Sequence, residues 1–562
     1  MSAVLTAQEP SAKYLVNLQP PLVRHFDLIA QAPGGVARLR ELILTLAVQG
    51  KLVPQDPSDE PASELLKKIR TEKDRLIAEG KIKRDKPLAE ISDEEKPFEL
   101  PQGWEWVRLG DVQSFTNGFA FKSTSFADEG VGVVRIGNVH HGEITEKGMV
   151  YVPFELSEKV DPQFFIAPDD LVITMTGDVK LGFNKSSNRY LLNQRVGKIT
   201  PILVDPSYLV FCLELVAEKK IEEASGSVIP NVSTGAINAT PFALPPLAEQ
   251  SHIVTRVEEL MQLCDALEAS GQLEAQQHAQ LVGTLLGTLT QSETPEALAD
   301  NWQRIATHFD VLLDRPEAVD ALEQTILQLA VRGLLVPQDP TDEPASVLLQ
   351  KIRTEKDHLI AQGKIKRDKP LPPITDEEKP FGLPQGWHWA RFGDVSINRD
   401  GERVPVSSTE RENRGKIYDY YGASGVIDKI DGFLFDKTLL LIGEDGANLI
   451  NRSTPIAFLA HGKYWVNNHA HVIDATHEEV MNYLCLFINA ISLEPYVTGT
   501  AQPKMNQAKL NSILIALPPL AEQVRIFTRV IELRSLCSDL HARILVAHAV
   551  QRNLADALVA AD

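Results

Sequence analysis

The chain contains two copies of one sequence block, and this repeat limits the folds open to it. Ile43–Val112 aligns without gaps with Ile326–Val395 at an offset of 283 residues, and about 55 of the 70 positions are identical. A second repeat pairs Ala243–Ala269 with Ala516–Ala542 at an offset of 273 residues. Self-similarity at a fixed offset indicates that one structural unit is built twice.

Two unlike segments lie between the repeated blocks. Gln113–Pro241 and Ser396–Leu514 have similar lengths but little sequence in common. A homodimer fused into one chain would repeat these segments as well. We call the repeated blocks the frame, and we call the two segments head 1 and head 2. The pattern predicts a pseudo-two-fold scaffold that presents two different heads.

The frame is predicted to be helical. Apolar residues recur at alternating four- and three-residue spacing, which is the pattern of a coiled-coil seam. They are Ile253, Val257, Leu260, Cys264 and Leu267 in the first copy and Ile526, Val530, Leu533, Cys537, Leu540 and Ile544 in the second. Two such helices would pack antiparallel and hold the heads apart. A shorter charged helix is expected at Glu64–Glu79, with its twin at Val347–Gln362, because Pro and Gly punctuate both ends.

The heads are predicted to be mixed α/β. Short β-type runs at Val131–Ile136, Leu171–Thr174 and Leu439–Ile442 lie between turns rich in Gly and Asp. The apolar stretches Leu209–Val216 and Leu484–Ile491 are typical of buried helices. The fold class expected is therefore α+β, with two α/β domains separated by two antiparallel coiled-coil helices.

The four cysteines are expected to be core residues in a reducing compartment. Cys212 corresponds to Cys485, and Cys264 to Cys537, at the 273-residue offset inside apolar stripes. They form no CxxC pair, which argues against a disulfide framework or a zinc site. No apolar run approaches the roughly 18 to 20 residues that span a bilayer, and the start lacks a secretory signal. We therefore expect a cytoplasmic protein without membrane contact.

Net charge argues against nucleic-acid binding at first sight. The chain carries a net charge of −20, whereas DNA-binding domains are usually basic. The charge is uneven, however, because Glu249–Glu323 alone holds 14 acidic and 3 basic residues. The heads together hold 29 acidic and 22 basic residues. More than half of the excess therefore lies in the helical middle, where a partner protein rather than DNA would be met.

The frame blocks resemble the conserved regions of type I restriction-modification specificity subunits. The shared motifs are LAVxGKLVPQ, LPxGW followed by LGDV, and LPPLAEQ followed by the apolar seam. Gly499 to Asn506, leading to Leu517-Pro518-Pro519, matches the end of a target recognition domain in that family, and Gly226 with Pro230-Asn231 matches it more loosely. The resemblance covers nearly the whole chain from about Leu39.

The resemblance implies a domain plan with two target recognition domains. Its limits are 1–38 for an N-terminal extension, 39–100 for the first helical conserved region, 101–248 for target recognition domain 1, 249–383 for the central helical region, 384–521 for target recognition domain 2 and 522–562 for the C-terminal spacer helix.

The resemblance also implies a function without catalysis in this chain. Each recognition domain would read one half of an asymmetric, bipartite site in double-stranded DNA. Two modification subunits would methylate adenine at N6 with S-adenosylmethionine, and two translocating restriction subunits would use ATP and Mg. This chain would hold no cofactor or metal. The seam residues expected to bind partner subunits are Val257, Leu260, Leu267, Val530, Leu533 and Leu540.

Several polar clusters in the heads suit DNA recognition. Asn and Gln pair with adenine in the major groove, and Arg and Lys pair with guanine. The candidate DNA contacts are Asn138, Asn193, Gln194, Arg195, Tyr420, Tyr421, Asn467, Asn468, His469, Gln502 and Asn506, together with Lys122, Arg135, Lys185 and Lys504 as phosphate contacts. The alternatives are amides that cap their own turns and tyrosines that fill the core.

Enzyme functions fit the sequence poorly. Asp205-Pro206-Ser207-Tyr208 approximates an adenine-methylase motif, but no glycine-rich cofactor loop accompanies it. No Walker A motif occurs, and His469 and His471 lack a third ligand at metal-site spacing. Asp169-Asp170 and Glu444-Asp445 are expected to be turn residues. The remaining alternative is a coiled-coil scaffold that never meets DNA, which the acidic charge favours and the divergent heads do not.

Overall fold

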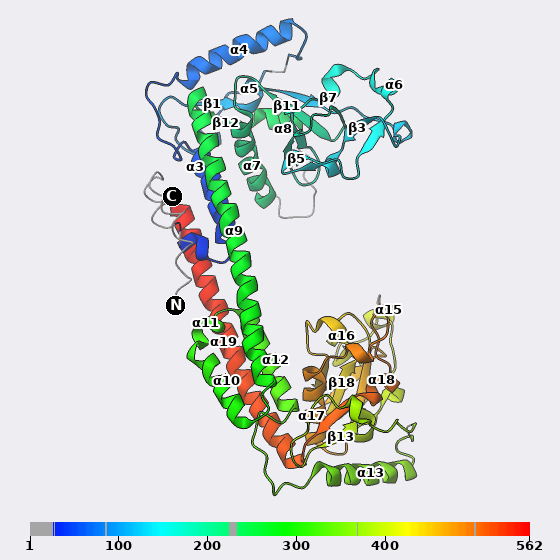
Figure 1. Cartoon of the computed structure of the whole chain (residues 1–562). Helices are drawn as coiled ribbons and strands as arrows, with labels where there is room; N and C mark the ends of the chain where they lie inside the picture. Colours follow the sequence, from blue (N-terminus) through cyan, green and yellow to red (C-terminus); the bar gives the residue numbers. More distant parts are fainter. Residues whose placement is uncertain are drawn as a thin grey trace. The chain divides into compact units, whose positions relative to one another are not determined.

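The computed structural model describes residues 26, 28–84, 87–223, 233–367, 369–499 and 502–561. The chain divides into two compact units, of which unit 1 comprises Met1–Gln272 with His548–Asp562 and unit 2 comprises Leu273–Ala547. Each unit contains one copy of the frame and one head (Figure 1). Two segments that took part in the family motifs lie outside the described residues, namely Gly226–Asn231 and Thr500–Ala501. Most of the N-terminal extension lies outside them as well.

Two long helices, α9 (Leu247–Thr290) and α19 (Leu520–Ala561), begin at equivalent points of the second repeat (Figure 1). α9 starts in unit 1 and ends in unit 2, whereas α19 starts in unit 2 and ends in unit 1. The expectation of two long helices that run in opposite directions is therefore confirmed. None of the helices in the described residues combines the length and the hydropathy that a membrane span needs.

The frame also contains a short-helix pair in each unit. In unit 1 these are α3 (Gly35–Val48) and α4 (Ala62–Ala78). Their equivalents in unit 2 are α12 (Pro316–Val331) and α13 (Ala345–Ala361), and α12 is preceded by α10 (Pro295–Thr307) and α11 (Phe309–Leu312).

The helices α4 and α13 form within two residues of the limits predicted from the sequence. Pro61 caps the start of α4, and Gly80 follows its end with a φ of 69°, a left-handed conformation that glycine adopts without strain. Each helix is tied to the head that follows it. Lys73 donates to the backbone oxygens of Gly110 and Gln113, and Lys356 donates in the same way to Gly393 and Ser396.

Head 1 is built on two sheets and a flanking helix. Strand order is β2-β11-β8-β9-β5-β4 in the larger sheet and β6-β3-β10-β7 in the smaller one. The strands are β2 (Gln113–Asn117), β3 (Val131–Val134), β4 (Val139–His140), β5 (Gly142–Ile144), β6 (Val150–Val152), β7 (Phe165–Ile166), β8 (Leu171–Thr174), β9 (Leu181–Phe183), β10 (Tyr190–Leu192) and β11 (Val196–Pro201). The helices are α5 (Leu109–Val112), α6 (Phe154–Ser157), α7 (Pro206–Glu223) and α8 (Thr234–Ala239).

Head 2 has two four-stranded sheets, ordered β14-β21-β18-β19 and β16-β15-β20-β17. The strands are β14 (Ile397–Asn398), β15 (Tyr418–Gly422), β16 (Gly425–Ile430), β17 (Phe435–Asp436), β18 (Leu439–Gly443), β19 (Ala457–Ala460), β20 (Lys463–Val466) and β21 (Ala470–Asp474). The helices are α14 (Phe392–Val395), α15 (Ser408–Glu412), α16 (Asn448–Asn451), α17 (Glu478–Ala490) and α18 (Gln507–Ser512).

The two heads share one strand order although their sequences differ. β2-β11-β8-β9 corresponds to β14-β21-β18-β19, and β6-β3-β10-β7 corresponds to β16-β15-β20-β17, while β5 and β4 extend the larger sheet of head 1 alone. The predicted α+β class, with two mixed α/β heads on a repeated frame, is confirmed.

A two-stranded ribbon closes each head where it joins the frame. In unit 1, β1 (Glu105–Arg108) pairs antiparallel with β12 (Pro241–Leu244). In unit 2, β13 (His388–Arg391) pairs with β22 (Leu514–Leu517) in the same way. The two ends of each head therefore lie side by side.

Candidate nucleic-acid interface

Each head contains a parallel strand pair in one of its two sheets, and a three-residue connection leads from the second strand of that pair into the other sheet. In head 1, β3 and β10 are parallel, with Leu192 opposite Val134. In head 2, β15 and β20 are parallel, with Tyr421 opposite Val466. The connections are Asn193–Arg195, between β10 and β11, and Asn467–His469, between β20 and β21. The structure thus brings two predicted clusters to equivalent places.

In head 1 the first residue of the connection holds its position in the fold. The backbone N–H of Asn193 donates to the oxygen of Val134, and its own oxygen accepts from Val196. Gly118 lies against this connection, because a Cβ at Gly118 would stand 1.9 Å from the Asn193 oxygen. Gln194 and Arg195 are exposed, and within the described chain their side chains make no hydrogen bond. Their donors and acceptors are free for a ligand.

In head 2 the equivalent connection has one free side chain. The N–H of Asn467 donates to the Tyr421 oxygen, and its buried side-chain Oδ1 accepts from the N–H of His469 over 2.8 Å. The His469 ring nitrogen Nδ1 lies 2.8 Å from a carboxylate oxygen of Asp445. Asn468 is exposed, and within the described residues its side chain makes no hydrogen bond. Asn467 therefore holds the turn, while Asn468 is free.

Behind this connection lies a buried network of charged groups. Glu444 follows β18 and accepts from Arg403 over 2.8 Å, and the Lys504 ammonium lies 3.2 Å from its other oxygen. His471 lies 2.6 Å from Asp400. Burial opposes the ionisation of Asp400, but the hydrogen bond and charge of His471, together with hydrogen bonds involving Val472 and Asn398, outweigh it and lower the pKa of Asp400.

Three members of this network have the side chains of a metal site. Ligand atoms of Asp400, Glu444 and His471 lie within 4.8 Å of one another. However, Arg403 and Lys504 already supply positive charge to these carboxylates. A divalent cation would have to displace them, so the cluster fits a buried ion-pair network better than a metal centre.

Three candidate DNA contacts serve the fold itself. Asn138 is 2% exposed, and its amide bonds the backbone of Arg135, Thr145 and Lys147. Asn506 caps α18 by accepting from the N–H of Lys509 over 3.0 Å. Tyr420 is 1% exposed, and its hydroxyl donates to the Val406 oxygen. Asn138 and Tyr420 reach no base without breaking contacts inside the head, whereas Asn506 is exposed and its cap hydrogen bond uses only the side-chain oxygen.

The remaining candidates differ in exposure. Lys122, Lys185 and Gln502 are exposed, and Lys504 is exposed over about half of its side chain at the edge of the charged network. Arg135 is half-buried and donates to the Gly148 oxygen over 3.0 Å. Tyr421 is half-buried and packs against Phe458 and Tyr464. Of these remaining candidates, the three lysines and Gln502 are therefore the ones that DNA can reach.

The seam residues pack inside their own units. Val257 and Leu260 belong to the core of unit 1, with Leu267 at its margin. Val530 belongs to the core of unit 2, with Leu533 and Leu540 at its margin. A second set of apolar residues on α19 is exposed and was not predicted from the sequence. It comprises Val524, Ile531, Leu536, Leu545 and Val546 in unit 2 and Val550 and Leu554 in unit 1. Val524, Ile531 and Leu545 stand at multiples of seven residues, a signal that was available in the sequence.

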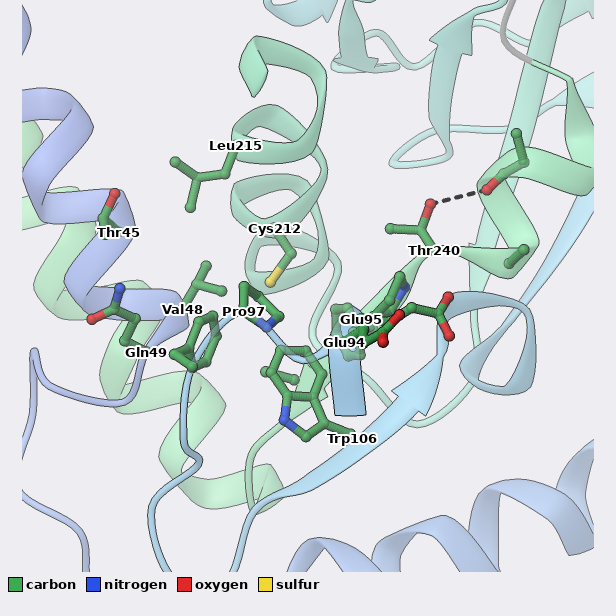
Figure 2. A pocket seen from close by; sticks show the side chains of 16 residues that line it. Thr45, Val48, Gln49, Glu94, Glu95, Pro97, Trp106, Cys212, Leu215 and Thr240 are labelled. Carbon is green, nitrogen blue, oxygen red and sulfur yellow. Dashed lines mark hydrogen bonds between the residues drawn. The ribbon is translucent and has the colours of Figure 1, made fainter. Parts of the chain in front are cut away.

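A pocket of about 560 Å³ lies in unit 1 between the frame and head 1 (Figure 2). Its walls come from α3, α7, β1 and β12 and include Val48, Trp106 and Leu215, with Cys212 facing it. Burial raises the pKa of Cys212 to about 12, so the thiol stays protonated at neutral pH. Glu95 at the rim is held by Arg108 over 2.8 Å. These side chains belong to the packing contact between the frame and head 1. They do not form an acid–base or nucleophilic pair.

The chain is similar in sequence to known proteins of one family. The family model described as the type I restriction modification DNA specificity domain matches residues 101–276 and 384–547. The Escherichia coli type I restriction enzyme EcoEI specificity subunit is 37% identical, with 93% of each chain covered. The EcoAI specificity subunit of Escherichia coli is 36% identical, again with 93% of each chain covered. Among solved structures, the HsdS subunit from Thermoanaerobacter tengcongensis matches with a TM-score of 0.37 and 18% identity, over 83% of this chain and 97% of that chain.

Proposed function

Since this chain belongs to the type I restriction-modification specificity subunits, a non-catalytic family whose members carry two target recognition domains, we propose that each head reads one half of an asymmetric, bipartite DNA site. The choice of site then directs adenine-N6 methylation or cleavage that partner subunits carry out. The base pairs between the two half-sites would not be read.

The proposal includes the partners and their cofactors. Two modification subunits would bring S-adenosylmethionine, and two restriction subunits would bring ATP and Mg for translocation. The domain limits predicted from the sequence, with recognition domains at 101–248 and 384–521, remain part of the proposal. The whole protein would act in the cytoplasm, where its DNA lies.

One observation carries the proposal most strongly. The two heads repeat the same strand order on a repeated frame, yet the side chains at their equivalent connections differ. A pure protein scaffold has no use for two such surfaces, whereas a reader of two different half-sites needs them. Exposed amide and guanidinium groups at these connections have the donors and acceptors that base edges require.

Partner subunits would bind the outer face of α19 rather than its seam. The exposed apolar residues Val524, Ile531 and Leu545 are available to another protein, whereas Val257, Leu260 and Val530 are buried in their own units. Apolar side chains at multiples of seven residues lie along one side of a helix, as in helices that pack against a partner helix. The acidic charge of Glu249–Glu323 is also compatible with a protein partner.

The decisive experiment maps N6-methyladenine at base resolution in DNA from cells that express this chain with its neighbouring modification subunit. We expect a single bipartite motif that is lost when either head is deleted. Assembly of the variants with the modification subunit should be checked by co-purification. An assembled, active complex that methylates no bipartite motif would contradict the proposal and favour a protein scaffold.

A further inference from the structure

The two heads place one free amide at the same point of the same fold. Gln194 and Asn468 are each the middle residue of the three-residue connection that follows the parallel strand pair. Both are exposed, and within the described chain neither side chain is bound to another group. The surrounding sequences differ between the heads, so this agreement does not follow from the frame repeat.

The residues on either side have other tasks. The first residue is anchored by its N–H to the neighbouring parallel strand: Asn193 donates to the oxygen of Val134 in β3, and Asn467 donates to the oxygen of Tyr421 in β15. In head 2 the third residue, His469, is held by Asp445. The connection is therefore fixed at its first position in both heads, and the middle side chain extends from a rigid base. Such preorganisation favours selective binding, because few conformations are lost when a ligand is bound.

The chemistry of the middle residue indicates its ligand. A carboxamide presents one donor and one acceptor side by side, which matches the N6 amino group and the N7 atom of adenine in the major groove. We infer that Gln194 and Asn468 are the specificity-determining residues of the two heads, each reading one adenine in a different half-site. This inference rests on the proposed function and goes beyond it by assigning one base contact to one residue in each head.

Arg195 distinguishes the two heads. It is exposed in head 1 and, in the described chain, its guanidinium makes no hydrogen bond, whereas its equivalent His469 is paired with Asp445. A free guanidinium matches the O6 and N7 atoms of guanine. The half-site of head 1 should therefore contain an adenine next to a guanine that is also read from this connection, while head 2 should read a single base there.

The test uses the complete complex and two matched variants, Gln194→Ala and Asn468→Ala. Each variant should lose the preference for adenine at one position of one half-site. The other half-site should stay unchanged. The two variants should affect different half-sites. A bidentate base contact accounts for roughly 5- to 150-fold discrimination, so methylation of sites with another base at that position should rise by about that factor. Because both side chains are exposed, the melting temperatures should equal that of the wild type.

The outcomes separate the inference from the proposed function. If the wild type methylates a bipartite motif but both variants keep both half-sites intact, the inference is wrong and the proposed function stands. It is also wrong if the two variants relax the same half-site. If the wild-type complex is assembled and active but gives no bipartite motif, the proposed function fails and the inference fails with it.

Discussion

The indole nitrogen of Trp104 donates a hydrogen bond to the carboxylate of Glu249 over 2.9 Å. The amide of Gln55 donates to the other oxygen of the same carboxylate over 3.1 Å. Glu249 is only 2% exposed, so this contact joins the first turn of α9 in the interior to the frame segment that precedes head 1. Trp387, Gln338 and Glu522 repeat the arrangement in unit 2, which indicates that it belongs to the frame.

Glu249→Gln should make stability less dependent on pH. Burial raises the pKa of Glu249 more strongly than the hydrogen bonds from Gln55 and Trp104 lower it. A raised pKa in the folded state means that the carboxyl's contribution is fully present below its unfolded pKa and is lost as pH rises through the folded value. The variant should therefore gain stability relative to the wild type as pH rises through this window. Urea unfolding at several pH values measures the difference, and a constant difference would contradict the prediction.

Glu249→Ala should be harmful at every pH. It leaves the buried Trp104 indole without an acceptor, and such a loss costs about 1–3 kcal/mol of the free energy of unfolding. Glu522→Ala provides the matched comparison, because the same contact exists in unit 2. Similar losses for the two variants would confirm that the frame is energetically repeated. A loss in only one of them would show that the neighbouring head alters it.

Reversing one charge in the frame should weaken its helix packing. Arg40 in α3 pairs with Asp265 in α9 over 2.5 Å, whereas the equivalent residue Glu323 in α12 pairs with Arg534 in α19 over 2.6 Å. The positive residue therefore lies on the shorter helix in unit 1 and on the long helix in unit 2. Glu323→Arg should lower the free energy of unfolding by about 0.2–1 kcal/mol, the range for exposed ion pairs. Adding Arg534→Glu should restore it, as a double-mutant cycle would measure.

Removing one exposed lysine of head 1 should weaken DNA binding without changing the motif. Lys122→Ala and Lys185→Ala each remove a positive charge that makes no side-chain hydrogen bond in the described chain. If each contacts one phosphate, the slope of log affinity against log salt should fall by about 0.9. Fluorescence anisotropy of the assembled complex at several salt concentrations provides the measurement. A changed methylation motif with an unchanged slope would instead assign the lysine to base recognition.

The cysteines should resist thiol reagents until the protein unfolds. Burial raises the pKa of Cys212 and Cys485 to about 12, and it also raises the pKa of Cys264 and Cys537. The reactive thiolate is therefore scarce at pH 8. Iodoacetamide labelling followed by mass spectrometry should detect modification in urea but not under native conditions. Rapid native labelling of Cys212 would show that the pocket of unit 1 opens in solution.

The sequence predicted elements whose signals are local. β8 occupies Leu171–Thr174 as expected, because a short apolar run bounded by turn residues suffices to mark it. α4 starts two residues earlier and ends one residue earlier than expected, since Pro61 and Gly80 set its ends. The parallel pairing of β3 with β10 could not be predicted in this way, because it joins segments far apart in the chain.

The candidate site was predicted in part for the same reason. Residue type marked Asn193–Arg195 and Asn467–His469 as candidate DNA contacts, but it gave no sign that the two clusters occupy equivalent places in the two heads. It could not separate an amide that bonds the backbone, as in Asn138 and Asn506, from a free one such as Asn468. Both have the same composition and the same kind of neighbours in sequence. Only the three-dimensional partners of the amide distinguish the two roles.

The ribbons that close the heads have a consequence for how this protein changes over generations. β1 pairs with β12, and β13 pairs with β22, so each head departs from and returns to the frame at a single location. A foreign head with the same entry and exit strands would join without bending the frame. The frame sequence on both sides of each head is largely repeated in the two copies, so homologous recombination has similar crossover points on either side of a head. The protein can in this way acquire a new specificity by exchanging one head, while the rest of the chain remains unaltered.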